Sequence, residues 1–194
     1  MNLENNNNLY PIFLKAHQLN ILLIGAGNVG LEKLSFLLKS SPNAKVEVVA
    51  PEIHPDIKSL AKKHHVAIVK QAYTNAYLDK KDIVIAATNK AQLNQQIHTD
   101  CKEKNILVNV ADTPAYCDFY LGGIVTKGNV KIAISTNGKS PTTAKRLRQF
   151  FEEIIPEDIN ELVENLNIYR KTIKGNFENK VATLNKLTKS LAKL

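Results

Sequence analysis

The chain has 194 residues, 44% of them hydrophobic and 23% charged, a composition typical of a globular protein with a sizeable core. Its apolar runs are far shorter than the ~20 residues of a membrane span, and its first residues lack the pattern of a secretory signal. We therefore expect a cytoplasmic protein that does not bind membranes. The net charge of +8, without interleaved aromatic and basic residues, argues against nucleic acid and favours an anionic small molecule.

The asparagine-rich residues 1–9 are predicted to be a disordered tail. Two cysteines, Cys101 and Cys117, lie in no Cys-x-x-Cys or Cys/His spacing, so we expect two reduced thiols and no protein-held metal.

Apolar runs alternate with helical patterns through the first half of the chain. The predicted strands are residues 20–24, 44–50, 66–69, 83–87 and 106–110, and the predicted helices between them include residues 29–38 and 57–64 and a segment through Ile97 and Cys101. This order is typical of βαβ units. The sequence therefore predicts an α/β fold, a Rossmann-type doubly wound parallel sheet.

A glycine-rich sequence, GAGNVG, occupies residues 25–30, between the first strand and the first helix. In such turns Gly25 would allow the tight bend, Gly27 a close approach of the backbone to a pyrophosphate, and Gly30 close packing of helix on strand. The N–H groups of Asn28 and Val29, at the helix start, suit phosphate oxygens. We predict NAD binding here; a tight turn without a ligand is the alternative.

Candidate contacts with the rest of the dinucleotide follow the next strands. Pro51 and Glu52 come just after the second strand, where an acidic residue usually meets the adenosine ribose, and the absence of a nearby arginine favours NAD over NADP. Thr88 follows the fourth strand and would either line the nicotinamide half of the site or cap the next helix.

The pattern changes after residue 112. Residues 121–126 and 130–135 predict a hairpin around Lys127-Gly128-Asn129. Pro141 and Pro156 each begin a predicted helix, and a last helix carries an apolar stripe from Phe177 to Leu191. Such a stripe is typical of a core or an oligomer interface.

Two polar features of this half suggest chemistry. Asp112 ends the fifth strand, where it would be a general base or an ordinary turn residue before Pro114. The loop of residues 135–141 leads into a helix N-terminus and suits an anion, through Thr136, Asn137, Gly138, Lys139 and Ser140.

Taken in order, these features resemble the precorrin-2 dehydrogenase family, which acts in sirohaem synthesis and occurs alone or at the N-terminus of fused sirohaem synthases. The resemblance covers residues 10–150 and is carried by YPIFL at 10–14, LIGAGNVG at 23–30 with Lys33 behind it, AATN at 86–89, NVAD at 109–112, and the 135–141 loop with AKRL at 144–147.

The resemblance implies NAD-dependent oxidation of precorrin-2 to sirohydrochlorin by a homodimer, with Asp112 as the catalytic residue, and in some members insertion of ferrous ion to give sirohaem. It places dinucleotide contacts on Asn28, Val29, Pro51 and Glu52. Two positions depart from the family: Gly30 replaces a common alanine, and Leu121-Gly122-Gly123 stands where a proline is frequent.

The positive charge of the second half of the chain is consistent with a substrate that carries carboxylates around its edge. Residues 112–150 hold six basic side chains against two acidic ones, and a basic cleft is expected from Lys139, Lys145, Arg146 and Arg148. The expected organisation is an NAD-binding domain at 10–112, a dimerisation and substrate segment at 113–147, and a helical domain at 148–194. The alternative is an NAD-sensing Rossmann module that regulates without catalysis.

Overall fold

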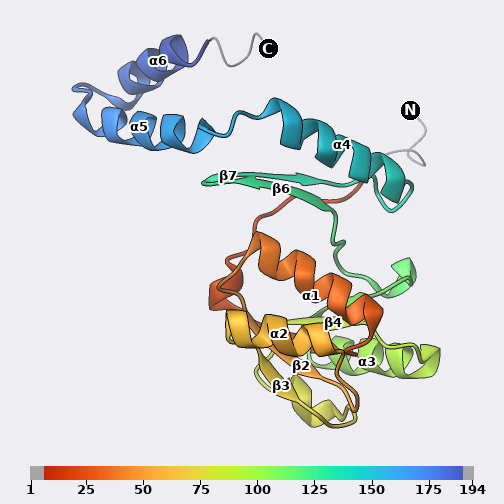
Figure 1. The fold of residues 1–194 in the computed structure, drawn as a ribbon. Helices are drawn as coiled ribbons and strands as arrows, with labels where there is room; N and C mark the ends of the chain where they lie inside the picture. Colours follow the sequence, from red (N-terminus) through yellow and green to blue (C-terminus); the bar gives the residue numbers. More distant parts are fainter. Residues whose placement is uncertain (1–6, 190–194) are drawn as a thin grey trace. The chain divides into compact units, whose positions relative to one another are not determined.

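The computed structural model describes residues 7–189. Its main sheet has five parallel strands in the order β3-β2-β1-β4-β5 (Figure 1). The strands are β1 (Asn20–Ile24), β2 (Lys45–Val49), β3 (Ala67–Val69), β4 (Ile83–Ala86) and β5 (Leu107–Val110). This order, with crossovers in both directions from β1, confirms the predicted doubly wound Rossmann-type sheet.

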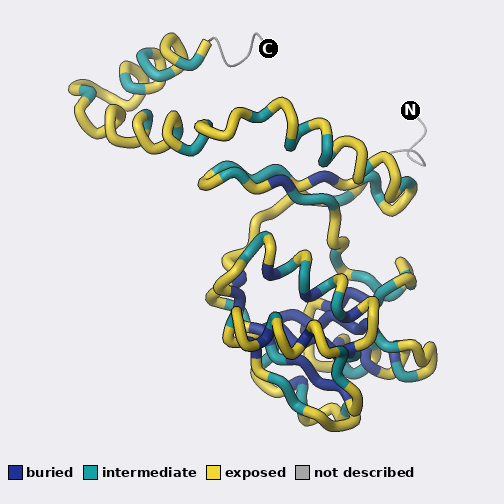
Figure 2. Tube along the Cα trace, in the orientation of Figure 1, coloured by how far each residue is buried: buried dark blue, intermediate teal, exposed yellow. Residues whose placement is uncertain are grey.

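Helices cover the two faces of the sheet and give it two hydrophobic clusters. Leu34 and Leu38 of α1 (Asn28–Ser40) and Ile57 of α2 (Pro55–His64) belong to one cluster, and Ile97 and Cys101 of α3 (Ala91–Glu103) belong to the other. Buried residues therefore run along the strands and the inner helix faces (Figure 2). Because both sheet faces are covered, the strands are continuous apolar runs rather than alternating ones.

The chain divides into two compact units. The sheet unit comprises residues up to 122 together with 135–141, and the hairpin–helix unit comprises residues 123–134 and those from 142 onward. The second unit contains the antiparallel pair β6 (Gly123–Lys127) and β7 (Val130–Ile134), followed by α4 (Pro141–Ile154), α5 (Ile159–Thr172) and α6 (Phe177–Leu187). The hairpin and the C-terminal helices thus match the predicted order of elements.

Several boundaries differ from the sequence predictions. α2 begins at Pro55 because His54 caps it, accepting a hydrogen bond from the N–H of Asp56. β6 begins two residues later than predicted, because Gly123 is the first residue that pairs across the hairpin. α5 begins at Ile159, after a turn that starts at Pro156.

Some predictions fall partly beyond the described residues. Most of the predicted 1–9 tail and Leu191 of the last apolar stripe lie outside them. In the part of the chain that is described, no helix is long and apolar enough to cross a membrane.

Candidate functional site

The glycine turn between β1 and α1 is built by two close backbone contacts. Gly25 has a φ of +100°, and a Cβ there would lie 2.4 Å from the carbonyl oxygen of Ala87. A Cβ on Gly30 would lie 2.2 Å from the carbonyl oxygen of Gly25. Both positions therefore require glycine in this backbone, and alanine at position 30 would need the turn to shift.

Gly27 is different because its surroundings are open. A Cβ built there meets no atom of the described chain within 4 Å, and the residue is exposed. Gly27 is the N-cap of α1, and no described side chain caps that helix. The first N–H groups of a helix have no partner within it, and the dipole makes this end positive. The turn thus leaves an open, electropositive backbone cradle that fits the pyrophosphate of a dinucleotide.

The segment after β2 lies against this turn. The N–H of His54 donates to the carbonyl oxygen of Ala26 over 3.0 Å, which holds residues 50–54 beside the glycines. Pro51 and Glu52 are both exposed there. The position of Glu52 suits the predicted ribose contact, which remains a prediction.

Thr88 occupies the neighbouring end of β4. Its hydroxyl donates to Oδ1 of Asn94 over 2.6 Å and accepts the N–H of Lys90 at 3.2 Å, while Nδ2 of Asn94 donates to the Thr88 carbonyl. These bonds tie Thr88 to the start of α3, although the N-cap of that helix is Lys90 and has no side-chain cap. A cofactor contact from Thr88 stays a prediction.

Asp112 lies at the same edge of the sheet, just beyond β5. The N–H of Ala111 donates to the carbonyl oxygen of Ala86, so the ends of β4 and β5 are joined directly before it. Asp112 is exposed and has a φ of +59°, the left-handed region that few residues other than glycine, asparagine and aspartate adopt. The structure therefore gathers the glycine turn, Thr88 and Asp112 at the carboxyl edge of three adjacent strands, where open α/β sheets bind ligands.

Two cysteines and one acid lie along β5, with Cys101 next to its start, Asp118 beside Val108 and Cys117 beside Val110. Burial raises the pKa of Cys101 to about 12 and also raises the pKa of Cys117, although the positive charge of Lys33 on α1 opposes the second effect. Burial would also raise the pKa of Asp118, but hydrogen bonds from Lys102 and from the N–H of Val108 outweigh it and lower the pKa. Both thiols are therefore protonated at neutral pH, and Asp118 is ionised.

The loop before α4 is organised by its own residues. Asn137 and Gly138 have positive φ angles, and the N–H of Lys139 donates to the carbonyl oxygen of Thr136. The Thr136 hydroxyl accepts the N–H of Ser140 at 3.2 Å. The side chain of Lys139 is exposed. This loop belongs to the sheet unit.

The basic residues of α4 belong to the hairpin–helix unit. Arg146 is exposed and donates to the side-chain oxygen of Gln149. Arg148 forms an ion pair with Glu152 one turn later, at 2.5 Å. Glu152 neutralises the charge of Arg148, whereas the Gln149 partner of Arg146 is uncharged, so Arg146 is the stronger candidate for an anionic ligand.

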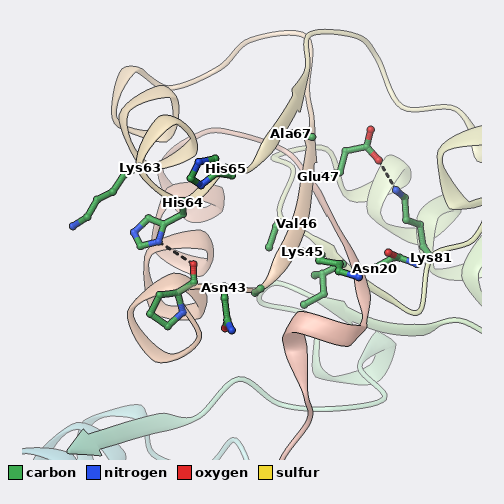
Figure 3. Close-up of a pocket in the computed structure, with 13 residues that line it drawn as sticks. Asn20, Asn43, Lys45, Val46, Glu47, Lys63, His64, His65, Ala67 and Lys81 are labelled. Carbon is green, nitrogen blue, oxygen red and sulfur yellow. Dashed lines mark hydrogen bonds and ion pairs between the residues drawn. The ribbon is translucent and has the colours of Figure 1, made fainter. Parts of the chain in front are cut away.

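A cavity of about 620 Å³ lies at the opposite, amino edge of the sheet (Figure 3). Lys81 is paired with Glu47 there, and Nδ1 of His64 lies 3.1 Å from the carbonyl oxygen of Pro42. The side chain of Lys63 points away from the other residues drawn. Basic residues at this edge sit at the C-terminal end of α2, where they complement the helix dipole. None of the predicted site residues lines this cavity. Within the described residues, no group of three or more metal-ligating side chains is present.

Comparisons with known proteins agree with this geometry. An NAD(P)-binding family model matches residues 12–123, and a model of the central region of sirohaem biosynthesis proteins matches residues 127–154. A sirohaem synthase of Psychrobacter cryohalolentis is 36% identical over 168 residues, which are 87% of this chain and 32% of that protein. A sirohaem synthase of Pseudoalteromonas atlantica is 37% identical, over 87% of this chain and 36% of that protein.

The chain therefore spans about a third of the length of these relatives. Among solved structures, it is similar in fold to SirC, a precorrin-2 dehydrogenase, with a TM-score of 0.71 and 21% identity over 92% of this chain and 89% of that one. Because the first family model covers more than half of the sequence, the chain belongs to this NAD(P)-binding family, and the second model adds a similarity to sirohaem biosynthesis proteins that continues into α4.

Proposed function

We propose that this protein is an enzyme that oxidises precorrin-2 to sirohydrochlorin, with NAD as the hydride acceptor. The observation that carries the proposal is the exposed carboxylate of Asp112 at the strand edge where the glycine turn opens. The identity to sirohaem synthases and the fold shared with a precorrin-2 dehydrogenase support it.

The cofactor fits residues of the sheet unit. The N–H groups of Asn28, Val29 and Gly30 would hold the pyrophosphate, and Gly27 leaves room for it. The Glu52 carboxylate would accept hydrogen bonds from the ribose hydroxyls. Its negative charge would repel a 2′-phosphate, which favours NAD over NADP. When bound, NAD supplies the hydride acceptor, and the protein must supply the base for the proton that leaves with the hydride. Asp112 takes that proton.

The substrate carries acetate and propionate carboxylates around its ring. In the sheet unit, exposed Lys139 would receive one of them, with the backbone of Thr136, Asn137, Gly138 and Ser140 forming the rest of that subsite. In the hairpin–helix unit, exposed Arg146 is a separate candidate partner for a carboxylate. Arg148 contributes less because Glu152 already neutralises it.

We also infer a cytoplasmic homodimer. Two free cysteines suit a reducing compartment. The exposed apolar residues of α4, Leu147, Phe150 and Ile154, suit a subunit interface. The proposed functional segments remain 10–112 for NAD, 113–147 for dimerisation and substrate, and 148–194 for the helices, with the interface continuing into the third segment through Phe150 and Ile154. Light scattering of the purified chain checks the dimer.

The deciding experiment is incubation of the protein with precorrin-2 and NAD, followed by absorbance of the sirohydrochlorin product. Parallel samples receive NADP in place of NAD, or ferrous ion in addition. Turnover with NAD supports the proposal, and a sirohaem spectrum that requires both ferrous ion and protein extends it to metal insertion. Tight NAD binding without any turnover would instead support the regulatory module.

A further inference from the structure

The turn that follows Asp112 is tied back along the open edge of the sheet. β5 is the last strand in the sheet order, so the outer backbone groups of Val108 have no neighbouring strand. Asp118 makes the hydrogen bonds that a further strand would make with Val108. Its N–H donates to the Val108 carbonyl oxygen over 2.8 Å, and its Oδ2 accepts a hydrogen bond from the Val108 N–H at 3.0 Å. Lys102 of α3 holds the other carboxylate oxygen at 2.7 Å.

Asn109 and Cys117 fasten the middle of the same turn. Asn109 is one of two buried polar residues among those described, and its Nδ2 donates to the carbonyl oxygen of Phe119 over 2.8 Å. The thiol of Cys117 donates to the carbonyl oxygen of Val110 over 3.2 Å and also approaches Nδ2 of Asn109. The bonds of Val108, Asn109 and Val110 therefore all join β5 to residues 117–119. Asp112 lies in the loop between them, and both ends of that loop are fixed to the same strand.

Resting on the proposed function, we propose that Asn109, Cys117 and Asp118 form a β5 clamp that positions the Asp112 carboxylate for proton abstraction. Asp112 holds a left-handed backbone conformation, which aspartate adopts more readily than most residues other than glycine and asparagine. Because the clamp fixes both ends of the loop, it restrains the backbone of Asp112 and hence the direction of its Cα–Cβ bond, from which the carboxylate extends. Asn109, Cys117 and Asp118 are positioning residues, since they act through Asp112.

Two disruptive variants and one conservative variant test the clamp. Asn109→Ala removes the bond to Phe119, and Asp118→Ala removes the carboxylate's bonds with the Val108 N–H and with Lys102 while its own N–H still bonds the Val108 carbonyl. Each should lower kcat by about 10–100-fold, since a misplacement near 1 Å costs up to about 100-fold. KM for precorrin-2 and the Kd for NAD should not change. Asp118→Asn keeps an oxygen for the Val108 N–H and should recover most of the loss.

A double-mutant cycle separates positioning from general damage. In an Asp112→Asn background, Asn109→Ala should reduce kcat by less than about 3-fold, because residues that act as a unit are strongly non-additive. The matched control is Lys81→Met, which breaks the ion pair with Glu47 at the amino edge and should leave kcat unchanged. Fully additive losses, or unchanged kcat in Asn109→Ala, would overturn the clamp.

Hydrogen exchange tests the clamp independently of activity. The amides of Thr113 and Asp118 donate to Val110 and Val108, so they should be protected in the wild type and exchange faster in Asn109→Ala. A wild-type protein that does not oxidise precorrin-2 would remove the proposed function and with it the role of Asp112 as base. Unchanged exchange in the variant would overturn the clamp itself.

Discussion

The two units of the molecule bury their helices very differently. In the sheet unit, each of α1, α2 and α3 contributes buried residues to a core shared with the strands. In the hairpin–helix unit, α4, α5 and α6 contain no buried residue among those described, and large apolar side chains such as Phe150 and Phe177 are more than half exposed. A rigid core can hold reacting groups in place, whereas an open helical surface suits binding. We therefore expect changes around the glycine turn and Asp112 to alter turnover and cofactor binding, and changes in α4 and in the exposed loop before it to alter substrate affinity.

The largest expected effect is that of Asp112→Asn. Asparagine has nearly the shape of aspartate and tolerates the left-handed backbone, but it cannot accept a proton at neutral pH. Dehydrogenation should fall by about 10²–10⁴-fold, the usual cost of removing a general base. Calorimetry should show unchanged NAD binding. A variant that turns over at the wild-type rate would mean that Asp112 is only a turn residue.

Gly27→Val should block NAD without unfolding the sheet unit. The position is open in the protein alone, so a Cβ there meets no described atom within 4 Å, but the new side chain would enter the space of the pyrophosphate. Titration calorimetry measures the affinity, and circular dichroism measures the fold. Gly30→Ala provides the contrast, because its Cβ would collide with the Gly25 carbonyl and should lower Tm. Near-normal NAD affinity in a folded Gly27→Val protein would remove the glycine turn from the site.

A moderate effect is expected from neutralising the exposed basic residues. Lys139→Met and Arg146→Met should each raise the KM for precorrin-2 and leave NAD affinity unchanged. Wild-type KM should also rise with salt, since exposed charges are screened over about 10 Å at 0.1 M. Arg148→Met is the matched control and should change KM less, because Arg148 is already paired with Glu152. Salt-insensitive kinetics, or equal effects of all three variants, would contradict the assignment.

The smallest expected effect concerns stability at high pH. Burial raises the pKa of Cys101 to about 12, above that of a thiol in the unfolded chain. A raised pKa in the folded state contributes stability that is complete below the unfolded pKa of about 8.5 and is lost as the pH rises towards 12. Urea unfolding should therefore show a free energy that declines above pH 9, and less steeply in Cys101→Ala. Parallel declines in the two proteins would show that Cys101 does not contribute.

The sequence by itself determined the order of the elements and the place of the glycine turn. Continuous apolar runs mark strands buried on both faces, and the spacing of Gly25, Gly27 and Gly30 marks the strand-to-helix turn, because both signals depend on local backbone requirements. The same reasoning placed Asp112 at the end of a strand.

Only the tertiary structure decided what holds these residues. The hydroxyl of Thr88 proved to be engaged at the start of α3, and Arg148 proved to be paired with Glu152. The bonds from Asn109 and Asp118 that enclose Asp112 depend on the chain folding back across an edge strand. Periodicity reports which face of an element is apolar, but it carries no information about which polar groups meet after the chain reverses, because those contacts are set by the packing of segments distant along the chain.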